Sequence, residues 1–339
     1  MVRRAIQTHL VEAMPEFVSN FKPAWWLPGP HLPTIWGKMV RRIAPVHDRL
    51  ERIATPDGDH VTLVRMGTIA KGVPHLFILH GLEGKISAKY AHGLLEQARR
   101  IGWSGDMLMF RSCDGEVNTV RRFYHSGETS DLDLVVRRLI VEHPEVHLVM
   151  CGVSLGGNVL LKWLGEHGAG VPAQVRRAAA VSVPYDLEAG ARLMENGFAR
   201  VYVRHFLSTL VAKTTKKLEL YPDLCDVGKL RAARTFFEFD DILTGPVHGF
   251  TGAHDYYHRS SSIHFIRDVR VPTLLLNARN DPFLPLSVLE TVRSTAEENP
   301  QLFVEFPATG GHVGWVSGQP WSPRYFMEER VVEWLSAGK

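Results

Sequence analysis

The chain has 339 residues, of which 45% are hydrophobic and 22% charged, and its formal net charge is +3 at pH 7. This length exceeds the roughly 250 to 300 residues that one hydrophobic core usually holds, so we expect one large domain with an insertion. The basic residues are scattered rather than gathered on one periodic face, which gives no support for nucleic acid as a partner. No run approaches 18 apolar residues, so we predict no transmembrane segment.

Three cysteines, Cys113, Cys151 and Cys225, stand far apart, and one falls inside a predicted strand. This arrangement argues against a disulfide framework or a zinc site and fits a reducing compartment, so we expect a cytoplasmic protein. The chain has no HExxH motif and no other compact cluster of metal ligands. We therefore predict that the protein uses neither a metal nor another cofactor.

Residues 1–48, which we call the strap, are rich in proline and tryptophan between positions 16 and 45. This composition predicts an irregular segment packed on the core rather than a regular element. Its tryptophans either fill space against the main core or shape part of a substrate entrance.

Strand and helix patterns alternate from residue 49 onward. Strands are predicted at 49–55, 60–66, 75–80, 106–110, 147–153, 178–183, 273–278 and 302–306, and helices at 88–100, 129–142, 155–167, 286–297 and 324–335. An initial hairpin followed by alternating strands and helices predicts an α/β fold with a mostly parallel central sheet flanked by helices on both faces. The core then consists of residues 49–184 and 271–339.

Residues 185–270, which we call the lid, interrupt this alternation with helical patterns and no convincing strand. The insertion falls on a connection that crosses the C-terminal edge of the sheet. An apolar stripe at Val203, Phe206, Leu207 and Leu210 either packs within the lid or forms the wall of an acyl-binding site, with the last three as candidate substrate contacts. The basic segment 213–217 is predicted to be a solvated face.

A nucleophile motif lies between the predicted strand at 147–153 and the predicted helix at 155–167. Ser154 occupies the turn, and Gly152 and Gly156 provide the small neighbours that a tight strand-to-helix turn needs. This is the GxSxG nucleophile elbow, which presents the serine hydroxyl at the C-terminal edge of a sheet. Because the same five-residue pattern also occurs in plain turns, the rest of the chain has to decide between the two interpretations.

A serine nucleophile needs a base, and the base needs an acid to orient it. Asp281 follows the seventh predicted strand, and His312 follows the eighth between glycines. The order serine, aspartate, histidine is that of the α/β-hydrolases, so we predict Ser154, Asp281 and His312 as a catalytic triad. Asp186, after the preceding strand, is an alternative acid, and Asp255 in the lid is a weaker one.

Two backbone amides are candidates for an oxyanion hole. The Leu155 N–H follows the nucleophile at a helix N-terminus, and the Leu82 N–H lies in the glycine-containing loop 80–84 after the third predicted strand. His80, at the start of this loop, is expected to shape it rather than to act as a base.

Long motifs occur over nearly the whole chain: WWL at 25–27, TIWG at 34–37, TPDGD at 55–59, HGLEG at 80–84, YHSGET at 124–129, GVSLGGN at 152–158, RTFFEFDD at 234–241, NDPFLP at 280–285 and GGHVGW at 310–315. Together they resemble the YheT-like branch of the α/β-hydrolases, which includes bacterial predicted hydrolases, plant embryogenesis-associated hydrolases and animal lipid-acting abhydrolase-domain proteins. One departure is Pro-His-Leu-Pro at 30–33, where relatives tend to have Gly-His-x-Gln. The resemblance implies a carboxylic ester hydrolase whose charge-relay residues match Ser154, Asp281 and His312.

We therefore predict a lidded serine hydrolase that cleaves carboxylic esters, with medium-chain or lipid-like acyl groups as candidates, through an acyl-enzyme on Ser154. The expected partner is a small ester. An acyltransferase or thioesterase using the same triad is the alternative, and a non-catalytic scaffold is a more distant one. Acyl chain length, leaving group and oligomeric state depend on packing that the sequence pattern does not encode.

Overall fold

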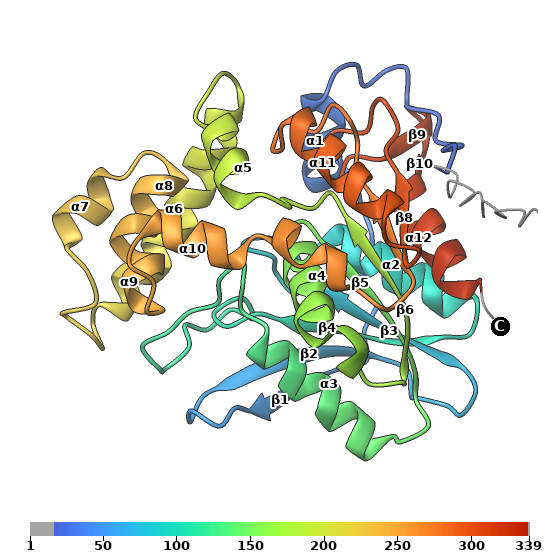
Figure 1. The fold of residues 1–339 in the computed structure, drawn as a ribbon, viewed down its shortest axis with the longest axis horizontal. Helices are drawn as coiled ribbons and strands as arrows, with labels where there is room; N and C mark the ends of the chain where they lie inside the picture. Colours follow the sequence, from blue (N-terminus) through green and yellow to red (C-terminus); the bar gives the residue numbers. More distant parts are fainter. Residues whose placement is uncertain (1–16, 338–339) are drawn as a thin grey trace, which may run out of the picture.

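The computed structural model describes residues 17–337, so the first 16 residues of the strap lie outside the described range (Figure 1). An eight-stranded sheet forms the centre, in the order β1-β2-β4-β3-β5-β6-β7-β8. The first two pairs in this order, β1 with β2 and β2 with β4, are antiparallel, and the remaining pairs are parallel. This sheet and its covering helices confirm the fold class predicted from the alternating elements.

The strands of this sheet are β1 (Arg49–Ala54), β2 (His60–Met66), β3 (Pro74–Leu79), β4 (Ser104–Met109), β5 (His147–Val153), β6 (Val175–Val181), β7 (Thr273–Leu276) and β8 (Leu302–Glu305). The helices outside the lid are α1 (His31–Met39), α2 (Lys89–Arg100), α3 (Ser130–Glu142), α4 (Leu155–His167), α11 (Leu286–Glu297) and α12 (Phe326–Ser336), with a short 3₁₀ turn η1 (Gly168–Gly170).

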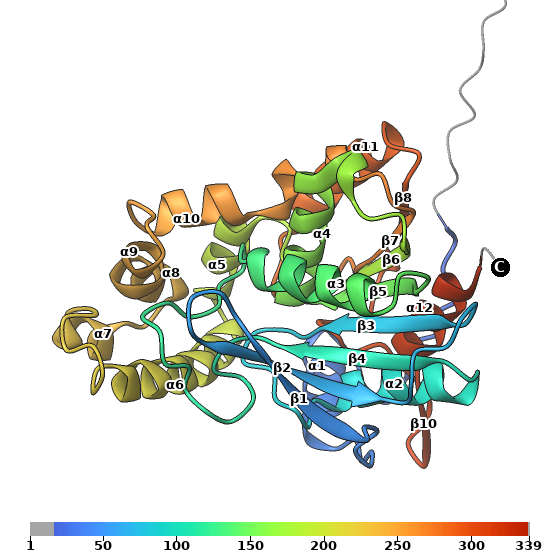
Figure 2. The ribbon, with the colours of Figure 1, turned by 90° about the horizontal axis from the view of Figure 1, so that it is seen from below.

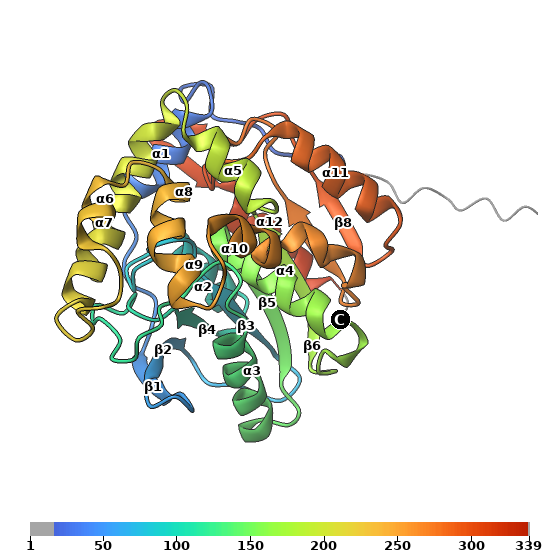
Figure 3. The same cartoon turned by 60° about the vertical axis from the view of Figure 1, so that its left-hand side comes forward.

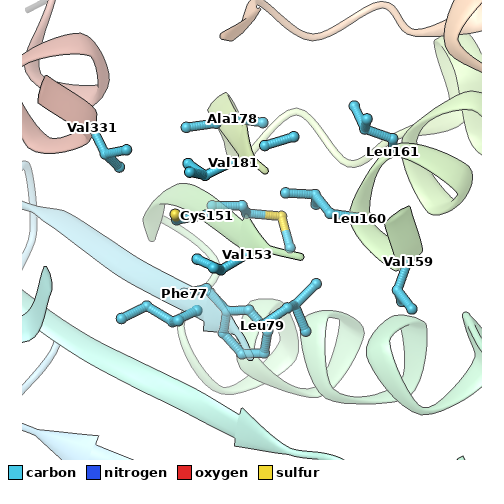
Figure 4. Close-up of a cluster of buried hydrophobic side chains, with 14 of the residues drawn as sticks. Phe77, Leu79, Cys151, Val153, Val159, Leu160, Leu161, Ala178, Val181 and Val331 are labelled. Atoms are coloured by element: carbon cyan, nitrogen blue, oxygen red, sulfur yellow. The ribbon is translucent and has the colours of Figure 1, made fainter. Parts of the chain in front are cut away.

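The central strands are covered on both faces. All six residues of β3 are buried, as are six of the seven residues of β5. A parallel strand with helices on both sides has no solvent face, which is why these segments read as continuous apolar runs rather than alternating ones. In Figure 4, side chains of β3, β5 and β6 fill the space between α4 and Val331 of α12.

The helices divide between the two faces of the sheet. In Figure 2, α2 and α12 lie on one face and α3, α4 and α11 on the other. α4 begins directly at the end of β5 and packs on the neighbouring strands β3 and β6. Because α4 follows a central strand without an intervening loop, residue 154 is held at the C-terminal edge of the sheet by two largely buried elements of the core.

The lid consists of helices that lie beside the sheet and extend from one end of it (Figures 1 and 3). Its elements are α5 (Leu187–Met194), α6 (Ala199–Lys217), α7 (Val227–Ala232), α8 (Phe236–Phe239), a π-helical turn η2 (Asp240–Thr244), α9 (Gly245–Val247), α10 (Ala253–Ser260) and two 3₁₀ turns, η3 (Ser262–His264) and η4 (Ile266–Asp268). No residue between 185 and 270 is in a strand. The division of the chain at these boundaries into domains remains a prediction.

The prediction of an irregular strap was wrong between residues 31 and 39, which form α1. The prolines do not prevent a helix here, because Pro33 lies in its first turn, where the N–H groups have no intrahelical partner. The Thr34 hydroxyl donates to the Pro30 carbonyl at 2.7 Å and helps to close this turn. Proline in the first turn is therefore compatible with a helix.

The last predicted helix begins two residues later than expected. Residues 324–325 belong instead to a small hairpin of β9 (Val316–Gln319) and β10 (Ser322–Tyr325) that the sequence analysis missed. Gly318, with φ of +78°, allows the chain to reverse near the hairpin tip. Short exposed strands carry little apolar periodicity, and this explains the omission.

The basic segment 213–217 is a solvated face only in part: Thr215 and Lys216 are exposed, but Lys213 is half-buried and Lys217 is buried, contrary to the prediction. The Lys217 side chain is fully buried, and its Nζ donates to Asn118 Oδ1 at 2.6 Å and to a backbone carbonyl of the same loop. Burial lowers the pKa of Lys217 to about 8. Lys213, one helical turn earlier, pairs with Glu83 of the core at 2.8 Å. Two lysines of α6 therefore hold the lid on the core.

Candidate functional site

Ser154 lies at the junction of β5 and α4 with φ of 54° and ψ of −123°. A non-glycine residue adopts positive φ only where its surroundings impose it, and nucleophile elbows are such places. A Cβ at Gly152 would lie 2.4 Å from the Gly156 carbonyl oxygen, and a Cβ at Gly156 would lie 2.4 Å from the Leu79 carbonyl oxygen. Both glycines are required by close backbone approach, as the motif predicted.

The structure brings the three predicted triad residues together. The Ser154 Oγ lies 2.9 Å from His312 Nε2, and His312 Nδ1 lies 2.9 Å from Asp281 Oδ2. The Asp281 side chain is 1% exposed and the His312 side chain 9%. Asp281 accepts a hydrogen bond from the Nδ1–H group of His312, so the unprotonated Nε2 faces the Ser154 hydroxyl and can take its proton. This is the arrangement that activates a serine.

Neighbouring loops orient these two partners of the serine. The second oxygen of Asp281 accepts the Phe283 N–H at 2.8 Å, so both carboxylate oxygens are used. The Phe283 ring stacks on the His312 imidazole with centroids 4.0 Å apart and an interplanar angle of 22°. The loop after β7 thus supplies both the acid and an apolar wall for the imidazole.

Thr34 of the strap is a further contact that the sequence analysis missed. Its hydroxyl accepts a hydrogen bond from the backbone N–H of His312 at 2.8 Å. The same segment also approaches the neighbouring residue closely, because a Cβ at Gly311 would lie 2.4 Å from the Pro30 carbonyl oxygen. The N-terminal helix α1 is therefore packed directly on the histidine loop. The Thr-Ile-Trp motif was the available signal, but nothing in its composition indicated which loop it would contact.

The alternative acids and base have other partners. Asp186 accepts the Ala189 N–H at 3.0 Å as the N-cap of α5, and Asp255 pairs with Arg259. His80 is fully buried; its Nδ1 donates to the Gly81 carbonyl at 2.7 Å and its Nε2 accepts the Phe110 N–H at 3.1 Å. Burial lowers the pKa of His80 to about 4, in keeping with a neutral ring that shapes its loop.

The backbone amides of the loop 80–84 can be accounted for one by one. The Gly81 N–H donates to the Tyr90 hydroxyl, the Glu83 N–H to the Tyr124 hydroxyl, and the Gly84 N–H to the Gly81 carbonyl. Leu82 alone among residues 81–84 has no described acceptor for its N–H. A backbone donor without a protein acceptor beside a nucleophile is suited to a substrate oxygen.

An apolar pocket of roughly 1100 Å³, including its open mouth, extends from Ser154 and His312 into the lid. Leu82 and Leu155 both border it. Its other apolar lining residues come mainly from the lid and include Leu187, Met194, Phe206, Leu210, Phe236, Phe239 and Leu243. Such a cavity accommodates an apolar chain attached to the group that reacts with the serine.

The predicted stripe of α6 is divided between two surroundings. Phe206 and Leu210 line the pocket, whereas Val203 and Leu207 do not border it and are buried in an apolar cluster of the lid. That cluster also includes the pocket-lining residues Met194, Phe239 and Leu243. The helix therefore packs within the lid through two residues of the stripe and borders the pocket through the other two.

The described residues were searched for helices that could span a membrane and for side chains that could hold a metal ion. Within residues 17–337, every helix is too short or too polar to span a lipid bilayer. The same residues contain no group of three or more histidine, cysteine, aspartate or glutamate side chains placed to hold a metal ion.

Comparison with known proteins places this geometry in a family. Residues 74–318 match the alpha/beta hydrolase fold family. YheT of Escherichia coli (strain K12) is 37% identical over 90% of this chain and 90% of its own, and the phospholipase ABHD3 of Mus musculus is 27% identical over 93% of this chain and 77% of its own. The monoacylglycerol lipase of Saccharomyces cerevisiae is 31% identical over 73% of this chain and 57% of its own. Among solved structures, the Pyrococcus furiosus esterase Pf2001 shares the fold, with a TM-score of 0.57 at 16% identity over 88% of this chain and 94% of its own. The chain therefore belongs to the α/β-hydrolase family, in its YheT-like branch.

Proposed function

We propose that this protein hydrolyses carboxylic esters with apolar acyl chains through a covalent acyl-enzyme on Ser154. Family membership and the lipase and phospholipase names of its relatives support ester hydrolysis as the general class of reaction. The observation that carries the finer proposal is the hydrogen-bonded series from Ser154 through His312 to Asp281 at the wall of an apolar pocket.

In the first half of the proposed reaction, His312 Nε2 takes the proton of the Ser154 hydroxyl as Oγ attacks the ester carbonyl carbon. The carbonyl oxygen becomes negative and is bound by the Leu82 and Leu155 N–H groups. Asp281 keeps Nδ1 protonated and stabilises the imidazolium. The tetrahedral intermediate then breaks its bond to the alcohol oxygen, which receives the proton from Nε2, and the acyl group stays on Oγ.

Water completes the cycle. His312 Nε2 takes a proton from water, the water oxygen attacks the acyl carbon, and the same two amides bind the new oxyanion. The bond to Ser154 Oγ then breaks, Oγ regains the proton, and the free acid leaves.

The test is hydrolysis of p-nitrophenyl butanoate together with labelling by a fluorophosphonate probe. The wild type is expected to do both, and Ser154→Ala is expected to lose labelling and to lower kcat on the order of 10⁶-fold. An unchanged Tm for the variant shows that the fold is retained. Wild-type protein that neither turns over nor labels, or a variant within tenfold of the wild type, would refute the proposal.

Acyl transfer with the same triad is distinguished by adding a short-chain alcohol to the assay. Hydrolysis predicts free acid as the main product, because the proposed second step uses water. A new ester as the main product at modest alcohol concentration would reassign the chain to acyl transfer while leaving the role of Ser154 intact.

A further inference from the structure

One charged pair joins the lid to the loop that carries the proposed oxyanion donor Leu82. The Lys213 Nζ of α6 lies 2.8 Å from Glu83 Oε1. Only 7% of the Glu83 side chain and 23% of the Lys213 side chain is exposed, and both residues line the catalytic pocket. Opposite charges that are partly shielded from water attract each other more strongly than a pair on an open surface does. The pair therefore forms a substantial link across the pocket.

Tyr124 holds the same glutamate from a second direction. Its hydroxyl donates to Glu83 Oε1 at 3.0 Å and accepts the Glu83 N–H at 2.8 Å. The Tyr124 ring stacks on Phe110 at the end of β4, with centroids 5.4 Å apart and an interplanar angle of 3°. The Tyr124 hydroxyl, which is fixed on the core, thus binds both the side chain and the backbone of Glu83. Lys213 of the lid supplies the positive charge that pairs with the Glu83 carboxylate.

The backbone of Glu83 needs such support. Its φ is 55°, a conformation that a residue with a side chain adopts only when its surroundings hold it there. Leu82 lies between this residue and Gly81, whose N–H is bound by Tyr90 at 2.8 Å. If Glu83 were released, the backbone of Leu82 would be held only on its Gly81 side. The direction of the Leu82 N–H group would then change.

We propose that Lys213 is a positioning residue for the oxyanion hole: by holding Glu83 it aims the Leu82 N–H, and the hole is complete only while α6 is docked on the core. This inference rests on the proposed function. It couples enclosure of the acyl chain by the lid to stabilisation of the reacting carbonyl group. A lid that moves away would leave a serine with its base but with a poorly directed oxyanion donor.

The test uses p-nitrophenyl acetate, whose acyl group is too short to depend on the apolar stripe of α6. Lys213→Met, Glu83→Gln and the double variant remove the pair, and Lys213→Arg keeps the charge. Lys216→Met is the matched control, because Lys216 is exposed on the same helix. The readouts are kcat, KM and the inhibition constant of a methyl trifluoromethyl ketone, which forms an oxyanion on the serine.

Lys213→Met and Glu83→Gln are each expected to lower kcat by about 10-fold to 100-fold and to weaken the ketone by a similar factor, since a displaced oxyanion donor acts on the transition state. KM should change little. The double variant should be no worse than the worse single variant, because both changes break one contact. Lys213→Arg and Lys216→Met should stay within about threefold of the wild type, because both leave the ion pair to Glu83 available.

Additive losses, a rise in KM without a fall in kcat, or unchanged ketone affinity in Lys213→Met would show that Lys213 only lines the pocket, and would overturn the inference. Thermal unfolding of each variant excludes loss of the fold, and Lys213→Arg provides the comparison if the methionine variant is unstable. Failure of the proposed function is separate, because it would appear as an inactive wild type before any variant is compared.

Discussion

The proposed base His312 depends on contacts from segments that are far apart in the chain. Asp281 orients its ring, Phe283 stacks on it, and Thr34 of the strap binds its backbone N–H. Asp281 selects the tautomer, Phe283 restricts the orientation of the ring plane, and Thr34 restricts movement of the loop that carries the histidine. A catalytic histidine held in this way needs little rearrangement before it accepts a proton.

The first residue-scale prediction concerns the acid. Asp281→Asn should lower kcat by roughly 10⁴-fold, because an amide at this position no longer selects the tautomer with a free Nε2. Asp186→Asn should change kcat by less than about threefold, since Asp186 caps a helix and an asparagine caps equally well. Steady-state kinetics of both variants on one ester provide the comparison, and the reverse ranking would assign the acid role to Asp186.

At the scale of elements, α6 combines two surfaces in one helix. Phe206 and Leu210 face the pocket, Val203 and Leu207 pack inside the lid, and Lys217 is bound by the core loop that contains Asn118. The helix is therefore fixed by buried contacts on its other sides and presents Phe206 and Leu210 to the pocket.

This division predicts the effect of acyl chain length. Each methylene of an acyl chain buried in the pocket contributes roughly 0.8 kcal/mol, so kcat/KM should rise from acetyl to medium-chain p-nitrophenyl esters. Phe206→Ala should flatten that rise more than it lowers acetyl ester turnover. Leu207→Ala is the matched control, expected to lower stability by about 2 to 5 kcal/mol with the rise preserved. An equal loss at every chain length for Phe206→Ala would mean that the side chain only packs the lid.

The π-helical turn η2 carries a second prediction. Asp240 is partly buried and borders the pocket, and loss of hydration raises its pKa to about 6 although the Thr244 and Tyr257 hydroxyls donate to it. The folded protein therefore keeps a proton between pH 4 and 6 that the unfolded chain has lost. The free energy of unfolding should fall as the pH rises through this range, by on the order of 2 to 3 kcal/mol, and level off above it.

Asp240→Asn provides the measurement, because asparagine does not titrate. Urea unfolding at pH 4, 5, 6 and 7 should show the wild type losing stability relative to the variant up to about pH 6, and no further relative change above it. A constant difference across the series would contradict the proposed burial of an ionisable group at this position.

At the scale of the whole molecule, buried charges connect the antiparallel part of the sheet to the helical layer. Arg111, which follows β4, is fully buried and binds Asp131 of α3 at 2.7 Å. It also lies 3.0 Å from Asp57 and 3.4 Å from Asp59, in the turn between β1 and β2. The TPDGD motif thus supplies two of the carboxylates that surround one guanidinium.

Arg111→Met should lower the free energy of unfolding by about 3 to 5 kcal/mol, because it removes the buried guanidinium beside Asp59 and leaves Asp57 and Asp131 with Arg122 alone. Activity at low temperature should be retained, since none of these residues borders the pocket. Urea denaturation and ester turnover at 10 °C measure the two effects. A loss of stability below about 1 kcal/mol would show that water or another cation replaces the guanidinium.

The features of this protein that are encoded locally could be predicted from its amino-acid sequence. Apolar runs predicted the central strands, helical periodicity predicted α2, α3, α4 and α11, and glycines around Ser154 predicted the turn after β5. The positions of Asp281 and His312 were also accessible, because the carboxyl ends of parallel strands meet at one edge of a sheet, and their order in the chain then restricts which loops approach the serine.

The distant segments that complete the candidate site could be identified only from the three-dimensional fold. Thr34 on the histidine loop, Lys213 on Glu83, and the burial of Lys217 all join residues separated by many positions, and no periodic pattern carries that information. Helix α1 contradicts an expectation based on proline content alone, because Pro33 occupies the first turn, where a helix tolerates proline. Long-range polar contacts depend on how whole elements pack. The sequence around a charged residue does not reveal whether its side chain will be solvated or will bind a buried partner.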